Sequence, residues 1–150
     1  MKKLRDFTLF NRLKNLLKPV NSIIYPLQKK PISINFKAEP MLRFNSDGTE
    51  KCNGCKKCEK ICPVNAIKIE IKTEKKRKAV TNFTIDLNRC IFCGLCEEIC
   101  PKETLVFGPN FEYAKFNKEE LIYTKERLLQ NGERWEYSAR QRFENKKVEE

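Results

Sequence analysis

A run of four cysteines occurs twice in the chain, and this repeat constrains the fold more than any other feature of the sequence. The first run begins at Cys52 and the second at Cys90, 38 positions later. Each has the pattern Cys-x2-Cys-x2-Cys-x3-Cys-Pro, and the two runs together contain all eight cysteines. A repeat of this kind predicts two similar halves related by a pseudo-twofold axis.

The spacing is that of the bacterial ferredoxin run, which binds a 4Fe-4S cluster, so two copies predict two 4Fe-4S clusters. Three thiolates separated by two residues each can wrap a loop around one cube. The chain then turns into a helix, and the fourth cysteine of each run is expected to bind the other cluster. This assigns cluster A to Cys52, Cys55, Cys58 and Cys100, and cluster B to Cys90, Cys93, Cys96 and Cys62.

The crossed ligation implies that the two clusters lie close together. Cys58 and Cys62 are four residues apart, which on a helix is about 6 Å along the axis. With the reach of the two side chains, the cubes are expected on the order of 10 Å apart. Electrons should tunnel rapidly between them.

Two other uses of eight cysteines are disfavoured. Disulfides are typical of secreted proteins, yet the start of the chain lacks the apolar stretch of a secretory signal, and cysteines two residues apart are poor bridging partners. All-cysteine zinc sites more usually have paired Cys-x2-Cys knuckles. The chain contains no His, which excludes the common zinc sites, His general bases and Ser-His or Cys-His nucleophile pairs. The absence of His therefore removes most hydrolases.

The charge of the chain is strongly positive, with 31 Lys plus Arg against 20 Asp plus Glu. Residues 1–51 carry 11 basic and 4 acidic side chains, so the excess lies mainly towards the front. The basic run 75–78 resembles a phosphate-binding segment. It lacks interleaved aromatic residues and a recognition helix, so we expect a solvated loop and no nucleic-acid partner.

Hydrophobic patterning predicts an α+β, two-cluster ferredoxin-like module over residues 40–108. Short strands are expected at 41–44, 68–71, 83–87 and 105–107, and short helices at 59–66 and 97–103. The apolar fraction of 40% includes the eight cysteines. The ordinary core is therefore thin, and cluster binding is expected to supply much of the folding free energy.

The module leaves arms at residues 1–39 and 109–150. Residues 2–18 have apolar side chains at three- and four-residue steps with basic residues between them, which predicts a basic amphipathic helix. It could lie on an anionic membrane surface, dock into a partner's groove or fold back on the module. Residues 21–40 predict an extended strap, and residues 117–130 one or two helices with Asn117 as N-cap and Glu120 in the capping-box position. With no apolar run of about 20 residues, the chain is expected to be soluble or membrane-peripheral, in a reducing compartment.

Several segments together resemble the two-cluster ferredoxin-like subunit of respiratory complex I, known as subunit I or the 23 kDa subunit of NADH-quinone oxidoreductase. They are Tyr25-Pro26, residues 44–52, residues 88–101 with Cys-Ile-Phe-Cys-Gly-Leu-Cys, and residues 119–129 with Glu-Glu-Leu-Ile-Tyr-Thr-Lys-Glu-Arg-Leu-Leu. The sequence departs from this family at residues 36–39, where the family usually has an Arg-Gly-rich stretch.

The resemblance implies an electron-transfer subunit of a proton-translocating enzyme. It would relay electrons from NADH and flavin, through its two clusters, to a terminal cluster beside the quinone site, and it would contain no catalytic residue of its own. Its partners would be other subunits of complex I, with residues 2–18 at the membrane surface and the protein peripheral on the cytoplasmic face of a bacterial inner membrane. The alternatives are a ferredoxin-like subunit of a membrane-bound energy-converting hydrogenase or related complex, and a soluble two-cluster ferredoxin.

Overall fold

A computed structural model describes residues 10–16, 22–33, 35–74 and 77–136. Contacts divide the chain into one unit that ends at Pro31 and a second that begins at Ile32. The three-part division predicted from the sequence stays a prediction. None of the helices in the described ranges is long and apolar enough to cross a membrane.

The described part of the first unit contains a short helix over residues 10–16, within the predicted amphipathic helix 2–18, the rest of which lies outside the described residues. Its apolar side chains Phe10, Leu13 and Leu16 are exposed. They recur at three-residue steps and form one stripe of the helix.

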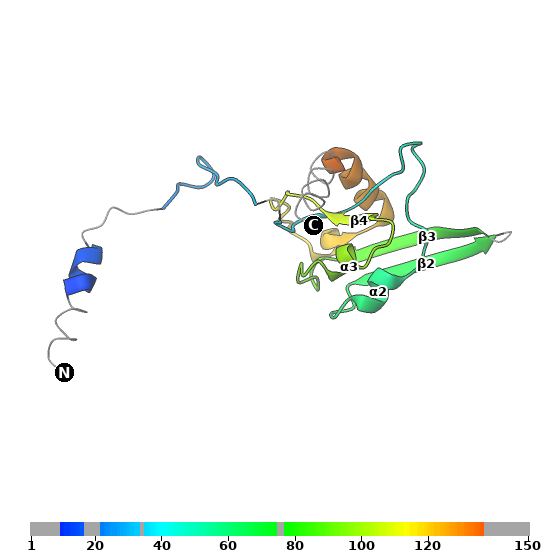
Figure 1. The fold of residues 1–150 in the computed structure, drawn as a ribbon, viewed down its shortest axis with the longest axis horizontal. Helices are drawn as coiled ribbons and strands as arrows, with labels where there is room; N and C mark the ends of the chain where they lie inside the picture. Colours follow the sequence, from blue (N-terminus) through cyan, green and yellow to red (C-terminus); the bar gives the residue numbers. More distant parts are fainter. Residues whose placement is uncertain (1–9, 17–21, 34, 75–76, 137–150) are drawn as a thin grey trace. The chain divides into compact units, whose positions relative to one another are not determined.

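Two antiparallel sheets form the framework of the second unit (Figure 1). Strand β1 (Pro40–Leu42) pairs with β4 (Leu105–Phe107), and β2 (Ile67–Glu74) pairs with β3 (Arg77–Asp86). The latter two form a hairpin longer than predicted, with an irregularity in register at Glu70/Ile71. A short fifth strand, β5 (Ile122–Tyr123), extends this sheet along β3. Mixed strands and helices confirm an α+β fold.

The two helices that follow the cysteine loops are shorter than predicted and begin earlier. Helix α2 (Lys57–Ile61) packs against α3 (Leu95–Glu98) and β2. The predictions of helix over 59–66 and 97–103 were therefore wrong in their bounds. Each run continues to a Cys-Pro pair, and proline disfavours helical geometry at the residue before it. Cys62 accordingly has extended backbone angles and ends α2.

The segment 117–130 does not form one continuous helix. A 3-10 helix η1 (Lys118–Leu121) is followed by β5, and an α-helix then covers residues 125–136. Asn117 makes no side-chain cap, so the predicted capping contact was wrong. The Leu87 N-H donates to the Leu121 carbonyl, and Ile85 pairs with Tyr123. Sheet pairing with distant residues thus overrides local helix propensity.

A buried carboxylate joins three separate segments of the second unit. Glu39 is 2% exposed, and its oxygens accept hydrogen bonds of 2.6 Å from Tyr123 Oη and of 2.6 Å from Asn110 Nδ2. Burial raises the pKa of Tyr123, and the bond to Glu39 raises it further, so the phenol remains a donor. This contact ties the residues before β1 to β5 and to the chain after β4.

The helix over residues 125–136 packs closely against β1. Leu128 is fully buried, and Asn131 Nδ2 donates to the Pro40 carbonyl at 3.2 Å. Gly132 lies directly against the Leu42 carbonyl, where an added Cβ would collide with backbone. The helix can therefore approach β1 this closely only because position 132 has no side chain.

We predict that Gly132→Ala destabilises the protein. Alanine in a helix is ordinarily favoured over glycine by about 1 kcal/mol. Here the collision with Leu42 should outweigh that gain, so the substitution should lower the free energy of unfolding by about 1–3 kcal/mol. Denaturant unfolding measures this change. Glu133→Ala, at an exposed neighbouring position, is the control, and a stabilising Gly132→Ala would contradict the packing.

Removing the Tyr123 hydroxyl should also destabilise the fold. Tyr123→Phe leaves the buried Glu39 carboxylate with one fewer donor, which should lower the free energy of unfolding by about 1–3 kcal/mol. The control is Tyr113→Phe, whose ring packs 6.5 Å from that of Tyr123 and which is partly exposed. Equal losses in the two variants would show that the Glu39 contact contributes nothing specific.

Candidate iron-sulfur site

The structure brings the eight cysteines together around two cavities of similar size. Cavity A, of about 370 Å³, is lined by Cys52, Cys55, Cys58 and Cys100. Cavity B, of about 380 Å³, is lined by Cys62, Cys90, Cys93 and Cys96. Both volumes include space open to solvent. These are the two groups that the sequence analysis assigned to clusters A and B.

The backbone around the cavities repeats its unusual conformations at the 38-residue offset. Positive φ angles occur at Gly54 and Phe92 (67° and 54°), at Lys56 and Gly94 (58° and 80°), and at Asn65 and Glu103 (49° and 48°). Only glycine adopts such angles without a steric cost. Each cysteine loop has two positions with positive φ, and one of them is glycine while the other is a larger residue. The glycine is at the first position in one loop and at the second position in the other, yet both loops have the same backbone geometry.

Backbone amides point at the last cysteine of each run. Ala66 N donates to Cys62 Sγ at 3.3 Å, and Thr104 N donates to Cys100 Sγ at 3.3 Å. A third such bond, of 3.4 Å, joins Phe92 N to Cys90 Sγ. Amide donors of this kind stabilise negative charge on sulfur.

The thiols are placed where they resist ionisation unless a cation is present. Burial raises the pKa of Cys58 to about 12 and that of Cys96 to about 12. Burial also raises the pKa of Cys52 and of Cys90. Neighbouring cysteines raise these pKa values further because thiolates repel one another. Bound iron offsets the cost of burying the thiolates and the repulsion between them, because cysteines bind iron as thiolates and lose their protons on binding.

Four cysteines line each cavity, which is the number of thiolates that a 4Fe-4S cluster binds. Within the described ranges, which include every cysteine, no three His, Cys, Asp or Glu side chains come close enough together to hold one metal ion. A zinc site would require four sulfurs about 2.3 Å from one centre. In a 4Fe-4S cube each thiolate binds a different iron, so four sulfurs spread around a cavity are what the cluster requires.

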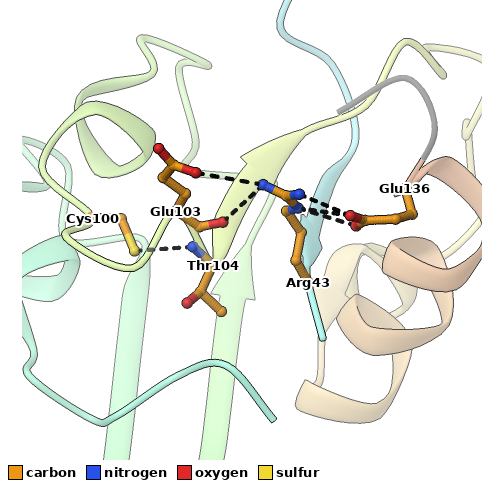
Figure 2. Close-up of polar contacts among 5 residues, drawn as sticks. All are labelled: Arg43, Cys100, Glu103, Thr104 and Glu136. Carbon is orange, nitrogen blue, oxygen red and sulfur yellow. Dashed lines mark hydrogen bonds and ion pairs between the residues drawn. The ribbon is translucent and has the colours of Figure 1, made fainter. Parts of the chain in front are cut away.

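An ion-pair network joins the rim of cavity A to the helix over residues 125–136, the C-terminal helix (Figure 2). Arg43 is 9% exposed, and its Nε and Nη2 donate to the Glu136 carboxylate at 2.8–3.2 Å. Its Nη1 lies 3.9 Å from Glu103 Oε2, and its backbone N-H donates to the Thr104 carbonyl at 2.8 Å. Because Thr104 N in turn contacts Cys100, the network runs from the helix to a cysteine of cavity A.

A second ion pair lies beside cavity B. Lys37 Nζ donates to Glu97 Oε2 at 2.6 Å, and the Glu97 side chain is 2% exposed. The Lys37 side chain crosses directly over Gly94, which lines cavity B, so a Cβ at position 94 would displace it. Glu59 occupies the equivalent position in the first half and pairs with Lys56 at 3.7 Å.

Sequence reasoning did not single out Arg43, Lys37 or Thr104 as part of the site. The partners of Lys37 and Arg43 lie 60 or more positions away in the chain, and no local pattern marks these two residues. The match of Glu59 with Glu97 in the repeat was the one available signal, because a carboxylate kept in both halves suggests a structural role.

Residues 51–104 match the 4Fe-4S dicluster domain family. They form a ferredoxin-like iron-sulfur electron-transfer domain. With two cavities of four cysteines each, this domain has room and donors for two 4Fe-4S clusters.

This chain also resembles a subunit of a solved membrane assembly, the membrane-bound sulfane sulfur reductase, described as an archaeal respiratory membrane complex. The TM-score is 0.51 and the sequence identity is 28%. The match covers 75% of this chain and 57% of the other, so this chain spans less than two thirds of the length of that subunit.

Substitution of the last cysteine in the first run should damage the cluster of the second run. Cys62 lines cavity B, so Cys62→Ala should remove or convert cluster B, with loss of up to about half of the iron, while cluster A persists. Iron analysis and electron paramagnetic resonance (EPR) of the reduced protein measure this. Cys100→Ala is the matched variant and should damage cluster A. Loss of cluster A in Cys62→Ala would refute the assignment.

Proposed function

We propose that this chain relays electrons between two 4Fe-4S clusters as a subunit of a membrane-bound respiratory complex. The observation that carries the proposal is the position of Cys58 and Cys62. Cys58 lies in the first turn of helix α2, Cys62 follows the last residue of this helix, and the two line different cavities. Four helical residues rise about 6 Å, which supports rapid tunnelling between clusters held there.

In this proposal the chain's own residues bind and insulate the clusters. The four cysteines of cavity A hold cluster A and the four of cavity B hold cluster B, and these clusters supply one-electron transfer when bound. Apolar side chains such as Ile69, Phe83 and Phe107 line the cavities and limit the access of water. No other residue of the chain takes part in bond making or breaking.

The complex that we propose first is NADH-quinone oxidoreductase. The supporting observation is the resemblance over residues 88–101 and 119–129, of which the second segment forms η1, β5 and the start of the C-terminal helix. The chain would then receive electrons from upstream cluster subunits and pass them towards the quinone site of a proton-translocating enzyme. It would belong to that enzyme at the cytoplasmic face of a bacterial inner membrane.

The structural similarity favours a second candidate. The solved relative belongs to a sulfane sulfur reductase, so this chain could serve a related membrane complex with a different electron donor or acceptor. The energy-converting hydrogenases are the other such class. In all of these the domain itself would perform the same transfer, and the accompanying subunits would determine donor and acceptor.

The exposed stripe of the N-terminal helix supports attachment to a membrane surface. Phe10, Leu13 and Leu16 lie on one stripe while Arg12 and Lys14 are also exposed. A helix with exposed apolar and basic side chains suits an interface with anionic lipid.

Recovery of the tagged chain from membranes in mild detergent tests the function. We expect a large assembly with iron in both clusters that reduces quinone with NADH. Activity with a sulfur substrate, hydrogen or ferredoxin in place of NADH would instead select the second candidate. Recovery of the chain as a small free protein in the soluble fraction would contradict both and leave a diffusing ferredoxin.

Charge on the apolar stripe should release the protein from membranes. Each buried Leu contributes about 1.5–3 kcal/mol, so Leu13→Asp with Leu16→Asp should lower partitioning to anionic vesicles more than about tenfold. Asn11→Asp with Asn15→Asp makes the same change in charge away from that stripe and is the control. Equal release by the two pairs would indicate that charge alone, and not the apolar stripe, holds the chain.

A further inference from the structure

The two cavities repeat the same unusual backbone conformations, but the position beside the last cysteine of each run is polar in cavity A only. Thr104 and Ala66 occupy equivalent positions, 38 residues apart, and the backbone N-H of each donates to the last cysteine of its run at 3.3 Å. Each of the two residues lines the cavity of that cysteine. Cavity A therefore has a hydroxyl at a position where cavity B has only a methyl group.

The hydroxyl of Thr104 has no hydrogen-bond partner among the described residues. The residue is 2% exposed, and its Oγ1 is buried and unpaired. Its backbone groups are already used, since the N-H contacts Cys100 and the carbonyl accepts from Arg43. A buried hydroxyl without a hydrogen-bond partner is destabilising, so this position favours a bound group that can accept from it.

The surroundings of Thr104 point to cavity A as the source of that partner. Figure 2 shows the hydroxyl on the side of the residue away from Arg43. Thr104 also lines a smaller cavity with Glu50 and Lys125, but these two pair with each other at 2.6 Å, and Lys125 also donates to the Val80 carbonyl. Cavity A is lined by its four cysteines and by apolar side chains, and its other polar lining residues lie in the first cysteine run or directly after the second: Asn53, Lys56, Lys57 and Lys102.

We propose that Thr104 Oγ1 donates a hydrogen bond to a sulfur of cluster A and thereby raises the reduction potential of cluster A relative to cluster B. This inference rests on the proposed binding of two clusters. Reduction adds negative charge to the cube, and a donor to sulfur stabilises the more negative state. Ala66 can offer no such bond, so the pseudo-symmetric halves acquire different potentials and the transferred electron favours cluster A.

The test is a redox titration of the purified full chain, with the two clusters followed by EPR. Thr104→Val keeps the shape of the side chain and removes the hydroxyl, and Thr104→Ser keeps the hydroxyl. We expect Thr104→Val to shift the partition of the electron away from cluster A about tenfold, which is about 59 mV for a one-electron couple. The reduction potential of cluster B should not change, and Thr104→Ser should keep the potential of cluster A at its original value. An unshifted cluster A in Thr104→Val with full iron content would overturn the proposal.

A substitution at the equivalent position of cavity B tests the same hydrogen bond without altering Thr104. Ala66→Ser places a hydroxyl beside the last cysteine that lines cavity B and should raise the potential of cluster B while leaving cluster A unchanged. An unshifted cluster B with full iron content would count against the proposal. Absence of either cluster from the unsubstituted chain would contradict the proposed function itself, whereas two intact clusters with insensitive potentials would contradict only the role of Thr104.

Discussion

Each cavity takes three cysteines from one half of the repeat and the fourth from the other half, and the rest of the domain depends on this exchange. Cys100 closes cavity A and Cys62 closes cavity B. Neither half can therefore complete a site alone, so the two must pack together. Helices α2 and α3 have to end before the Cys-Pro pairs, and this explains why they contain only five and four residues. Since the buried thiols have raised pKa values, folding and cluster binding should be strongly coupled.

On this symmetric framework the chain places different side chains in the two halves. Glycine and a larger residue exchange places between the loops, at Gly54 and Phe92. The Phe92 ring then packs 6.3 Å from Phe107, whereas Gly54 leaves room for Ile71. The loop of the second half thus gains an aromatic contact, and that of the first half accepts close packing from the β2–β3 hairpin. A common backbone does not impose a common environment on the two clusters.

The sequence predicted the grouping of the cysteines and the four strands because both depend on local spacing and alternation. The lengths of the helices were wrong because the Cys-Pro pairs end them early. Residues 117–130 contain two helices, as the prediction allowed, but strand β5 between them was missed because it depends on pairing with Ile85, far away in the chain. The roles of Glu39 and Arg43 were missed for the same reason, since their partners Tyr123 and Glu136 lie 84 and 93 positions away. Long-range contacts leave no periodic signal in the sequence.

The surroundings of the two cavities favour the same direction of electron transfer as Thr104. Lys57 and Lys102 line cavity A, together with Lys56, which pairs with Glu59 at 3.7 Å, while the exposed rim of cavity B includes Ile91 and Leu95. Positive charge stabilises a reduced cluster and an apolar rim disfavours it. Lys37 lies near cavity B, but Glu97 pairs with it at 2.6 Å and offsets its charge. Charge and hydrogen bonding therefore act together, and an electron that enters the domain should come to rest on cluster A, next to the Arg43 network that joins this side of the domain to the C-terminal helix.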